Sequence, residues 1–166
     1  MAIIIEKAKP SDAEALIAFL KQVGSETDNL SFGAEGLPVS VEEEWEYIAA
    51  LENSANGIML LAKLDGKIVA SASLSRLPRR MSHRAEIGIT VLKEYWSRGI
   101  GTGFAERLIA FAAENGVEII EAQVRSDNHA SLRLCEKFGF TRLCTYPAYL
   151  KINGESISAE LLQLRL

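Results

Sequence analysis

The segment Arg98–Gly103 (Arg-Gly-Ile-Gly-Thr-Gly) constrains this chain most strongly, because three glycines stand where a predicted strand gives way to a predicted helix. The strand is expected over Ala85–Val91 and the helix over Phe104–Glu114. Glycines let successive backbone N–H groups converge, and the start of a helix adds unpaired donors and a positive dipole end. Such a turn binds a phosphate, with Arg98 as its charge partner. The alternative is a tight connection that binds nothing.

Two phosphate-binding motifs of other folds are excluded at this turn. The dinucleotide fingerprint needs a third glycine where this chain has Phe104, and it follows its strand directly, whereas Leu92–Ser97 intervene here. A P-loop ends in Gly-Lys followed by Ser or Thr, and Arg98–Gly103 contains no lysine. An anion bound at this turn therefore belongs to a different fold.

Hydrophobic periodicity and turn residues predict strands and helices along the whole chain. Asp65-Gly66 marks a hairpin turn, and Ser40 with Glu43 forms a capping box ahead of a helix. A hairpin-rich first half and a strand–helix–strand second half predict an α/β fold, a mixed sheet with helices on its faces. The expected strands are Ile3–Lys7, Ile58–Leu64, Lys67–Leu74, Ala85–Val91, Val117–Val124, Phe140–Leu150 and Ile157–Leu166, and helices are expected from Ser11 to Gly24, after Ser40, over Phe104–Glu114 and from Asp127 to Lys137.

Composition limits the classes of function. A chain of 166 residues suits one domain, and its net charge of −4 argues against a broad nucleic-acid-binding surface. Two cysteines and two histidines are too few for a disulfide framework or a zinc site, so we expect no metal. The sequence has neither a transmembrane-length apolar run nor a secretory signal, so we expect a cytoplasmic protein that binds neither nucleic acid nor membrane.

Two segments of the second half resemble the motifs of one family. Val91–Gly103, which contains an Arg-x-x-Gly-x-Gly pattern starting at Arg98, is similar to the acetyl-CoA signature of the GNAT family of N-acetyltransferases. Val124–Phe140 is similar to that family's second motif, in which an asparagine, here Asn128, precedes a helix ending in Gly-Phe. The resemblance implies one catalytic domain over 1–166, with a mixed sheet of about seven strands splayed in the middle and about four flanking helices.

The resemblance also implies how the co-substrate acetyl-CoA is bound. The strand ending at Val91 would present its main chain to the pantetheine arm, and the amides of the glycine-rich turn would hold the pyrophosphate. Asn128 would contact the pantetheine or thioester region. The cofactor-binding residues implied in this way are Ile89, Thr90, Val91, Ser97, Arg98, Gly99, Ile100, Gly101, Thr102, Gly103, Asn128 and Ser131.

The chain departs from the family pattern at two positions tied to catalysis. Many relatives place a tyrosine as general acid where Cys135 stands, and some peptide-acetylating relatives carry a glutamate where Gln123 stands. A thiol is able to donate a proton, but a buried cysteine is also an ordinary small hydrophobe. Glu86 is the remaining candidate base, with a solvated carboxylate as the alternative interpretation. The candidate catalytic residues are therefore Glu86 and Cys135.

The acceptor is expected beside the loop after the first helix. In related sequences this segment borders the acceptor, and here it runs from Glu26 to Leu37. Glu26 and Thr27 are the candidate substrate-binding residues, since a carboxylate attracts a cationic amine. The acidic run Glu42–Glu46 is expected to form a solvated face of the second helix.

The expected function is transfer of an acetyl group from acetyl-CoA to a primary amine, on a small molecule, directly within a ternary complex. Two alternatives remain open. One is a non-catalytic acyl-CoA sensor or partner-binding subunit, which Cys135 and Gln123 suggest. The other is an acetyltransferase acting on protein N-termini or lysines. Strand edges in folds of this type often pair, so a homodimer is expected by analogy.

Overall fold

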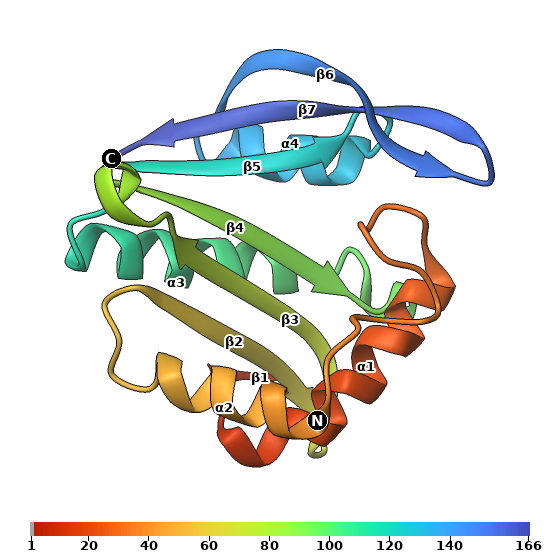
Figure 1. The fold of residues 1–166 in the computed structure, drawn as a ribbon, viewed down its shortest axis with the longest axis vertical. Coiled ribbons are helices and arrows are strands. Elements are labelled where there is room, and N and C mark those ends of the chain that lie inside the picture. Colours follow the sequence, from red (N-terminus) through yellow and green to blue (C-terminus); the bar gives the residue numbers. More distant parts are fainter. Residues whose placement is uncertain (1) are drawn as a thin grey trace.

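The computed structural model describes residues 2–166, which form a seven-stranded sheet flanked by four helices (Figure 1). The strand order is β1-β2-β3-β4-β5-β7-β6, and neighbouring strands are antiparallel except for β4 and β5. The strands are β1 (Ile4–Lys7), β2 (Gly57–Leu64), β3 (Lys67–Arg76), β4 (Arg84–Val91), β5 (Ile119–Arg125), β6 (Thr141–Ile152) and β7 (Glu155–Arg165), and the helices are α1 (Ala13–Glu26), α2 (Val41–Leu51), α3 (Ile100–Glu114) and α4 (His129–Lys137).

The expected order of elements and the mixed sheet are confirmed, whereas one helix start differs in a way that matters for the site. α3 begins at Ile100, inside the glycine-rich segment, rather than at Phe104. Gly99 adopts a left-handed conformation (φ 79°) that turns the chain directly into the helix. At the start of α2 the predicted capping box forms, with the Ser40 hydroxyl and the Glu43 carboxylate each accepting the other residue's amide.

The helices divide between the two faces of the sheet (Figure 1). α1 and α2 cover one face of the part formed by β1–β4, and α3 covers the other face. α4 lies beside the β5 side of the sheet, near the start of α3. No helix within residues 2–166 is long and apolar enough to cross a membrane. The core includes the fully buried side chains of Leu16, Ile48, Leu61, Phe104, Leu108, Ile120 and Leu162.

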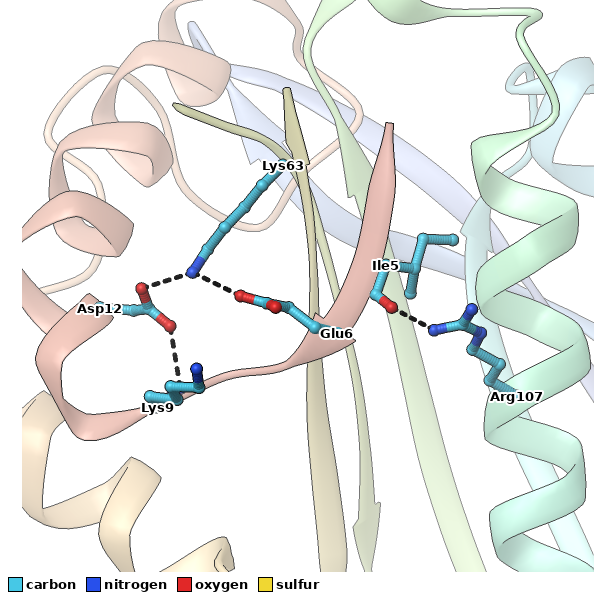
Figure 2. A network of polar contacts seen from close by, with 6 residues as sticks. All are labelled: Ile5, Glu6, Lys9, Asp12, Lys63 and Arg107. Atoms are coloured by element: carbon cyan, nitrogen blue, oxygen red, sulfur yellow. Dashed lines mark hydrogen bonds and ion pairs between the residues drawn. The ribbon is translucent and has the colours of Figure 1, made fainter. Parts of the chain in front are cut away.

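A polar network fastens the edge strand β1 (Figure 2). Lys63 Nζ of β2 donates to Glu6 Oε1 (2.9 Å) and to Asp12 Oδ1 (2.7 Å). Although burial of the ammonium opposes the change, the two carboxylates raise the pKa of Lys63, and the bond from Lys63 lowers the pKa of Glu6. Asp12 also closes a 3-10 turn, so α1 begins at Ala13 rather than at the expected position 11. Arg107 of α3 donates to the main chain of β1 from the other side.

The sheet opens between β4 and β5. These two strands pair only where Arg84–Glu86 lie beside Ile119–Glu121, and there Arg84 forms an ion pair with the buried Glu121. Beyond Glu86, β4 continues beside β3 alone. The edge of β4 that faces β5 therefore carries backbone groups without a strand partner. The predicted splay of the middle strands is confirmed, and it positions the cleft.

Candidate active site

A cleft of about 690 Å³ occupies the opening between β4 and β5. A volume of this size is typical of sites for small molecules and cofactors. The cleft brings together elements from distant parts of the chain, and its lining includes Ile87–Val91 of β4, Ala122–Arg125 of β5, the first turns of α3 and α4, the segment after α1, and Tyr149 and Leu150 of β6.

The β4 wall of the cleft is an unpaired strand edge. Ile89, Thr90 and Val91, which were expected to bind a pantetheine arm, all line the cleft. The Val91 carbonyl accepts a hydrogen bond from the indole N–H of Trp96 (2.8 Å), and a carbonyl oxygen has a second lone pair. An extended ligand is therefore able to lie along β4 and bond to its main chain as an added strand would.

The glycine-rich turn meets the cleft at the N-terminus of α3. Ser97 (φ 60°) and Gly99 (φ 79°) are both left-handed, and together they bend the chain into the helix. The first amides of α3 have no acceptor within the helix, so they are available to an anion. Of the residues expected to hold a pyrophosphate, those that line the cleft are Ser97, Gly99, Ile100, Gly101 and Thr102.

Two residues of the same turn lie outside the lining of the cleft. The Arg98 guanidinium stands 5.1 Å from the centre of the Tyr95 ring and donates to the Glu94 carbonyl (3.1 Å). A Cβ at Gly103 would lie 2.9 Å from Ile5 Cδ1, so this glycine allows α3 to approach β1 closely. The glycine at position 103 is therefore explained by packing against β1. The preceding residues, Ser97 and Gly99–Thr102, face the cleft instead.

Asn128 and Ser131 lie together at the start of α4. The Asn128 side-chain oxygen caps the helix by accepting the Ser131 amide (3.3 Å), and both residues line the cleft. Cys135, one turn further along, also lines it and is otherwise buried. Burial, reinforced by the Glu136 carboxylate, raises the pKa of the Cys135 thiol to about 11. The thiol is therefore protonated at neutral pH, a state suited to a proton donor and not to a nucleophile.

Glu86 lies on the same face of β4 as Gly88 and Thr90, which line the cleft. Its own side chain is exposed and lies outside the lining. Its cross-strand neighbour is Ser75 of β3, whose hydroxyl lies 3.5 Å from the Tyr47 hydroxyl of α2. Glu86 is thus beside the cleft on the face of the sheet that α1 and α2 cover.

Glu26 and Thr27, the expected acceptor residues, have different surroundings. Thr27 lines the cleft, whereas Glu26 does not. The Glu26 carboxylate accepts hydrogen bonds from the Lys93 amide (2.8 Å) and the Gln22 side chain (3.1 Å). In this position Glu26 joins the end of α1 to the segment that follows β4.

Several residues of the cleft wall have no signal in the sequence. Arg125 of β5 binds both carboxylate oxygens of Asp127 (2.6 and 3.0 Å) and donates to the Asp28 carbonyl (3.1 Å). It thereby fastens the segment after α1 across the cleft. Tyr149 reaches the cleft from β6, far along the chain from both motifs. Gln123, singled out earlier only as a missing carboxylate, is part of the same wall.

A second, smaller pocket of about 470 Å³ adjoins the cleft beneath α2. Phe32, Gly88 and Thr90 line both cavities, so the two adjoin along β4. The pocket adds hydroxyl and carboxyl groups to the site. Within residues 2–166 no group of three His, Cys, Asp or Glu side chains is arranged to hold a metal ion.

Glu44 lines this second pocket and is only 6% exposed. The expectation that the whole run Glu42–Glu46 forms a solvated face is therefore wrong at this residue. The capping box at Ser40 fixes the start of α2, and Glu44 then lies one turn before the buried Ile48, on the face toward the sheet. The capping box is visible in the sequence and fixes which residues of α2 face the sheet. The spacing of Glu44 and Ile48 would therefore have predicted that Glu44 is buried.

Comparison with known proteins agrees with this architecture. The profile of the Acetyltransferase (GNAT) family matches residues 25–140. YoaA of Bacillus subtilis, described as an uncharacterized N-acetyltransferase, is 27% identical over 158 residues, which are 92% of this chain and 86% of YoaA.

Solved structures with the same fold include an acetyltransferase of the GNAT family from Streptococcus pneumoniae, with a TM-score of 0.95 and 30% identity over 99% of this chain and 100% of that one. The structure of yncA from Salmonella typhimurium, solved with its cofactor acetyl-CoA, has a TM-score of 0.86 at 22% identity and covers 100% and 95% of the two chains. The profile match spans more than half of the sequence and the signature turn lies in the cleft. The chain therefore belongs to the GNAT family of N-acetyltransferases, enzymes that take their acetyl group from acetyl-CoA.

Proposed function

We propose that the protein transfers the acetyl group of acetyl-CoA directly to the primary amine of a small molecule, with both substrates bound at once. The observation that carries this proposal is the cleft at the β4–β5 opening, which runs from the first turn of α3 to the segment after α1. Acetyl-CoA bound at the α3 end and an acceptor amine bound at the α1 end would meet where β4 and β5 separate. The proposal treats 1–166 as one catalytic domain, and the single sheet supports this.

The residues at the α3 end fit acetyl-CoA. The first α3 amides, from Ile100 onward, suit the pyrophosphate, and the edge of β4 from Ile89 to Val91 suits the amide groups of the pantetheine arm. Asn128 and Ser131 flank the region where the arm would end. Bound in this way, acetyl-CoA supplies a thioester that is already activated for acyl transfer, so positioning provides much of the acceleration.

The remaining chemistry is a transfer of protons. A primary amine with a pKa near ~10.4 is mostly protonated at neutral pH and must lose a proton before it attacks. Glu86, which lies beside the cleft, accepts this proton through a water molecule and passes it to solvent. The nitrogen lone pair then forms the new C–N bond, and the nitrogen loses its second proton to Glu86 by the same route as the C–S bond breaks. Cys135 donates a proton to the departing sulfur and regains one from solvent. The products are the acetylated amine and the free thiol of coenzyme A.

The state of Cys135 favours direct transfer over an acetylated cysteine intermediate. Its thiol has a pKa raised to about 11 by burial. Because the thiolate is the nucleophilic form, a thiol that stays protonated at neutral pH is a poor nucleophile. The acceptor amine is therefore the nucleophile that meets the thioester.

Two features of the acceptor side support a small molecule as the acceptor. Arg125 donates to the Asp28 carbonyl and Glu26 accepts the Lys93 amide, so the segment after α1 is held in place at this end of the cleft. Gln123 occupies the position where some peptide-acetylating relatives have a glutamate, and an amide cannot act as a base. Both features favour a compact amine over a protein N-terminus.

Thermal unfolding with and without acetyl-CoA tests the donor site. A ligand at 100-fold its dissociation constant stabilises a one-site protein by about 2.7 kcal/mol, so we expect a clear rise in melting temperature. The absence of a shift at millimolar acetyl-CoA would overturn the proposal.

A panel of primary amines, followed by release of the coenzyme A thiol, tests the acceptor. We expect turnover with small amines in the panel. Stabilisation by acetyl-CoA without turnover of any amine would instead indicate an acyl-CoA sensor. Turnover confined to peptides would show that the acceptor is a protein.

A further inference from the structure

Glu44 is a buried carboxyl group without a partner. Its side chain is 6% exposed and lies between α2 and the sheet. Within residues 2–166 no hydrogen bond or ion pair engages its carboxylate, whose oxygens keep some contact with solvent, and desolvation by burial raises its pKa. The neighbouring Glu43 differs, because its carboxylate accepts the Ser40 amide (2.7 Å) in the capping box. Partial burial of a carboxylate without a protein partner costs free energy, so the stability of the fold does not explain Glu44.

The pocket around Glu44 supplies no positive charge. We call this cavity the α2 pocket. The described residues that line it include no lysine, arginine or histidine, and Glu43 and Tyr47 are the other titratable ones. Its lining includes Leu16, Leu20, Phe32, Glu44, Met59 and Thr90. A counter-ion for Glu44 therefore has to arrive with a ligand.

The α2 pocket adjoins the cleft where the reaction is proposed to occur. Phe32, Gly88 and Thr90 line both cavities. Thr90 belongs to the β4 edge assigned above to the pantetheine arm. A molecule in the α2 pocket is therefore able to place one end at the β4–β5 opening and the other end beneath α2.

The residues that line the α2 pocket indicate the chemistry of the middle part of such a molecule. The side chains of α1, β2 and the segment before α2 are aliphatic, and Phe32 adds an aromatic surface. Hydroxyl groups come only from Ser71, Ser73, Thr90 and Tyr47. A volume of about 470 Å³ accommodates a small molecule with an apolar chain.

We propose that the α2 pocket binds the far end of the acceptor and that Glu44 selects amines carrying a second cationic group, so that diamines are preferred over monoamines of equal length. This inference rests on the proposed acetyltransferase function. One amine of the acceptor is acetylated at the β4–β5 opening while the other, still protonated, pairs with the Glu44 carboxylate. Partial burial strengthens this pairing, because less water surrounds the ion pair in the pocket than at an open surface.

Steady-state kinetics with two matched amines test the inference. The probes are cadaverine, a pentane chain with an amine at each end, and hexylamine, in which a methyl group replaces one amine. We expect kcat/KM of the wild-type protein for cadaverine to exceed that for hexylamine by about tenfold or more. In Glu44→Gln we expect this preference to vanish, through a higher KM for cadaverine with little change in kcat.

Control variants separate recognition from folding. Glu44→Gln keeps the shape of the side chain and removes an unpartnered buried acid, so its melting temperature should not fall. Glu44→Asp keeps the charge and should retain part of the preference. Glu46→Gln changes an exposed acid of the same helix outside the pocket, and it should leave both amines unaffected.

The outcomes distinguish failure of this inference from failure of the proposed function. If acetyl-CoA stabilises the protein but cadaverine is not acetylated, or if wild type and Glu44→Gln show the same ratio for the two amines, the selection by Glu44 is wrong. If acetyl-CoA neither stabilises the protein nor supports turnover of any amine, the proposed function itself fails.

Discussion

The two ends of the cleft differ in the kind of chemical group that faces the cavity. At the α3 end the groups that face the cavity are largely main chain: the first amides of α3, exposed by the left-handed Gly99, and the unpaired edge of β4. At the α1–α2 end they are side chains from distant elements, among them Thr27, Glu44 and Tyr149. A main-chain site depends on backbone conformation and tolerates many side chains, whereas a side-chain site changes with each substitution. The main-chain end is the one proposed to bind acetyl-CoA, the donor that the family shares. The side-chain end is the one proposed to bind this protein's own acceptor.

Replacing the candidate base Glu86 should produce the largest loss of activity. The loss should affect acetyl transfer to the acceptor and leave acetyl-CoA binding unchanged. We expect Glu86→Gln to lower kcat by about 100-fold or more, because an amide cannot take the amine proton. Stabilisation by acetyl-CoA should persist, since Glu86 lies outside the cleft lining. Glu118→Gln, an exposed acid directly before β5 and outside the cleft lining, is the matched control. Unchanged turnover in Glu86→Gln would remove this residue from the mechanism.

Cys135 lies between the two ends, and its replacement tests the proton returned to sulfur. We expect Cys135→Ala to lower kcat by about tenfold, less than the loss of the base, because a thiolate is a tolerable leaving group. The thiol pKa is raised to about 11, so the donor keeps its proton as the pH rises through the ordinary cysteine range. The wild-type kcat should therefore show no loss of the donor between about pH 8 and pH 10. A fall in kcat with an apparent pKa near 8.5 that Cys135→Ala abolishes would contradict this assignment.

The same raised pKa of Cys135 has a consequence for stability. The folded protein holds the thiol proton more tightly than the unfolded chain does, so this contribution is fully present below the ordinary cysteine pKa. It is lost as the pH rises toward about 11. Cys135→Ala should accordingly flatten the alkaline part of the curve of unfolding free energy against pH.

Gly99→Ala tests whether backbone conformation, and not a side chain, makes the donor end. Its φ of 79° strains any residue with a Cβ, and no atom lies within 4 Å of the added group, so the effect comes from the backbone alone. We expect about 1 kcal/mol lower stability and about fivefold weaker acetyl-CoA binding, as the first turn of α3 shifts. Calorimetric titration and thermal unfolding measure the two effects.

Gly66→Ala is the matched control for this change. Gly66 has φ 80° and equally open surroundings, but it lies in the β2–β3 hairpin turn, remote from the cleft. It should lower stability similarly and leave acetyl-CoA affinity unchanged. Equal losses of affinity in the two variants would mean that the turn acts only through global stability.

The same division explains what could be predicted from the sequence. Glycines and a helix start are local signals, so the strand-to-helix turn was identified, although α3 begins at Ile100 because Gly99 itself serves as its cap. The acceptor end depends on tertiary placement. Glu26 was a reasonable candidate by charge, yet its carboxylate is engaged by the Lys93 amide, and Tyr149 arrives from a distant hairpin. Glu44 lies between these cases, because the helix phase would have located it.

The smallest expected effect is that of Arg98→Ala, and it most directly challenges the contrast between the two ends. The Arg98 side chain is exposed, stacks on Tyr95 and lies outside the cleft lining, so it contributes only long-range attraction for an anionic ligand. We expect about threefold weaker acetyl-CoA binding at low salt, vanishing at about 1 M salt, as for other exposed charges. Arg80→Ala, an exposed arginine outside the cleft, is the control. A loss of 100-fold or more that persists in salt would mean that the guanidinium turns inward to grip the ligand, and the donor end would then depend on a side chain as the acceptor end does.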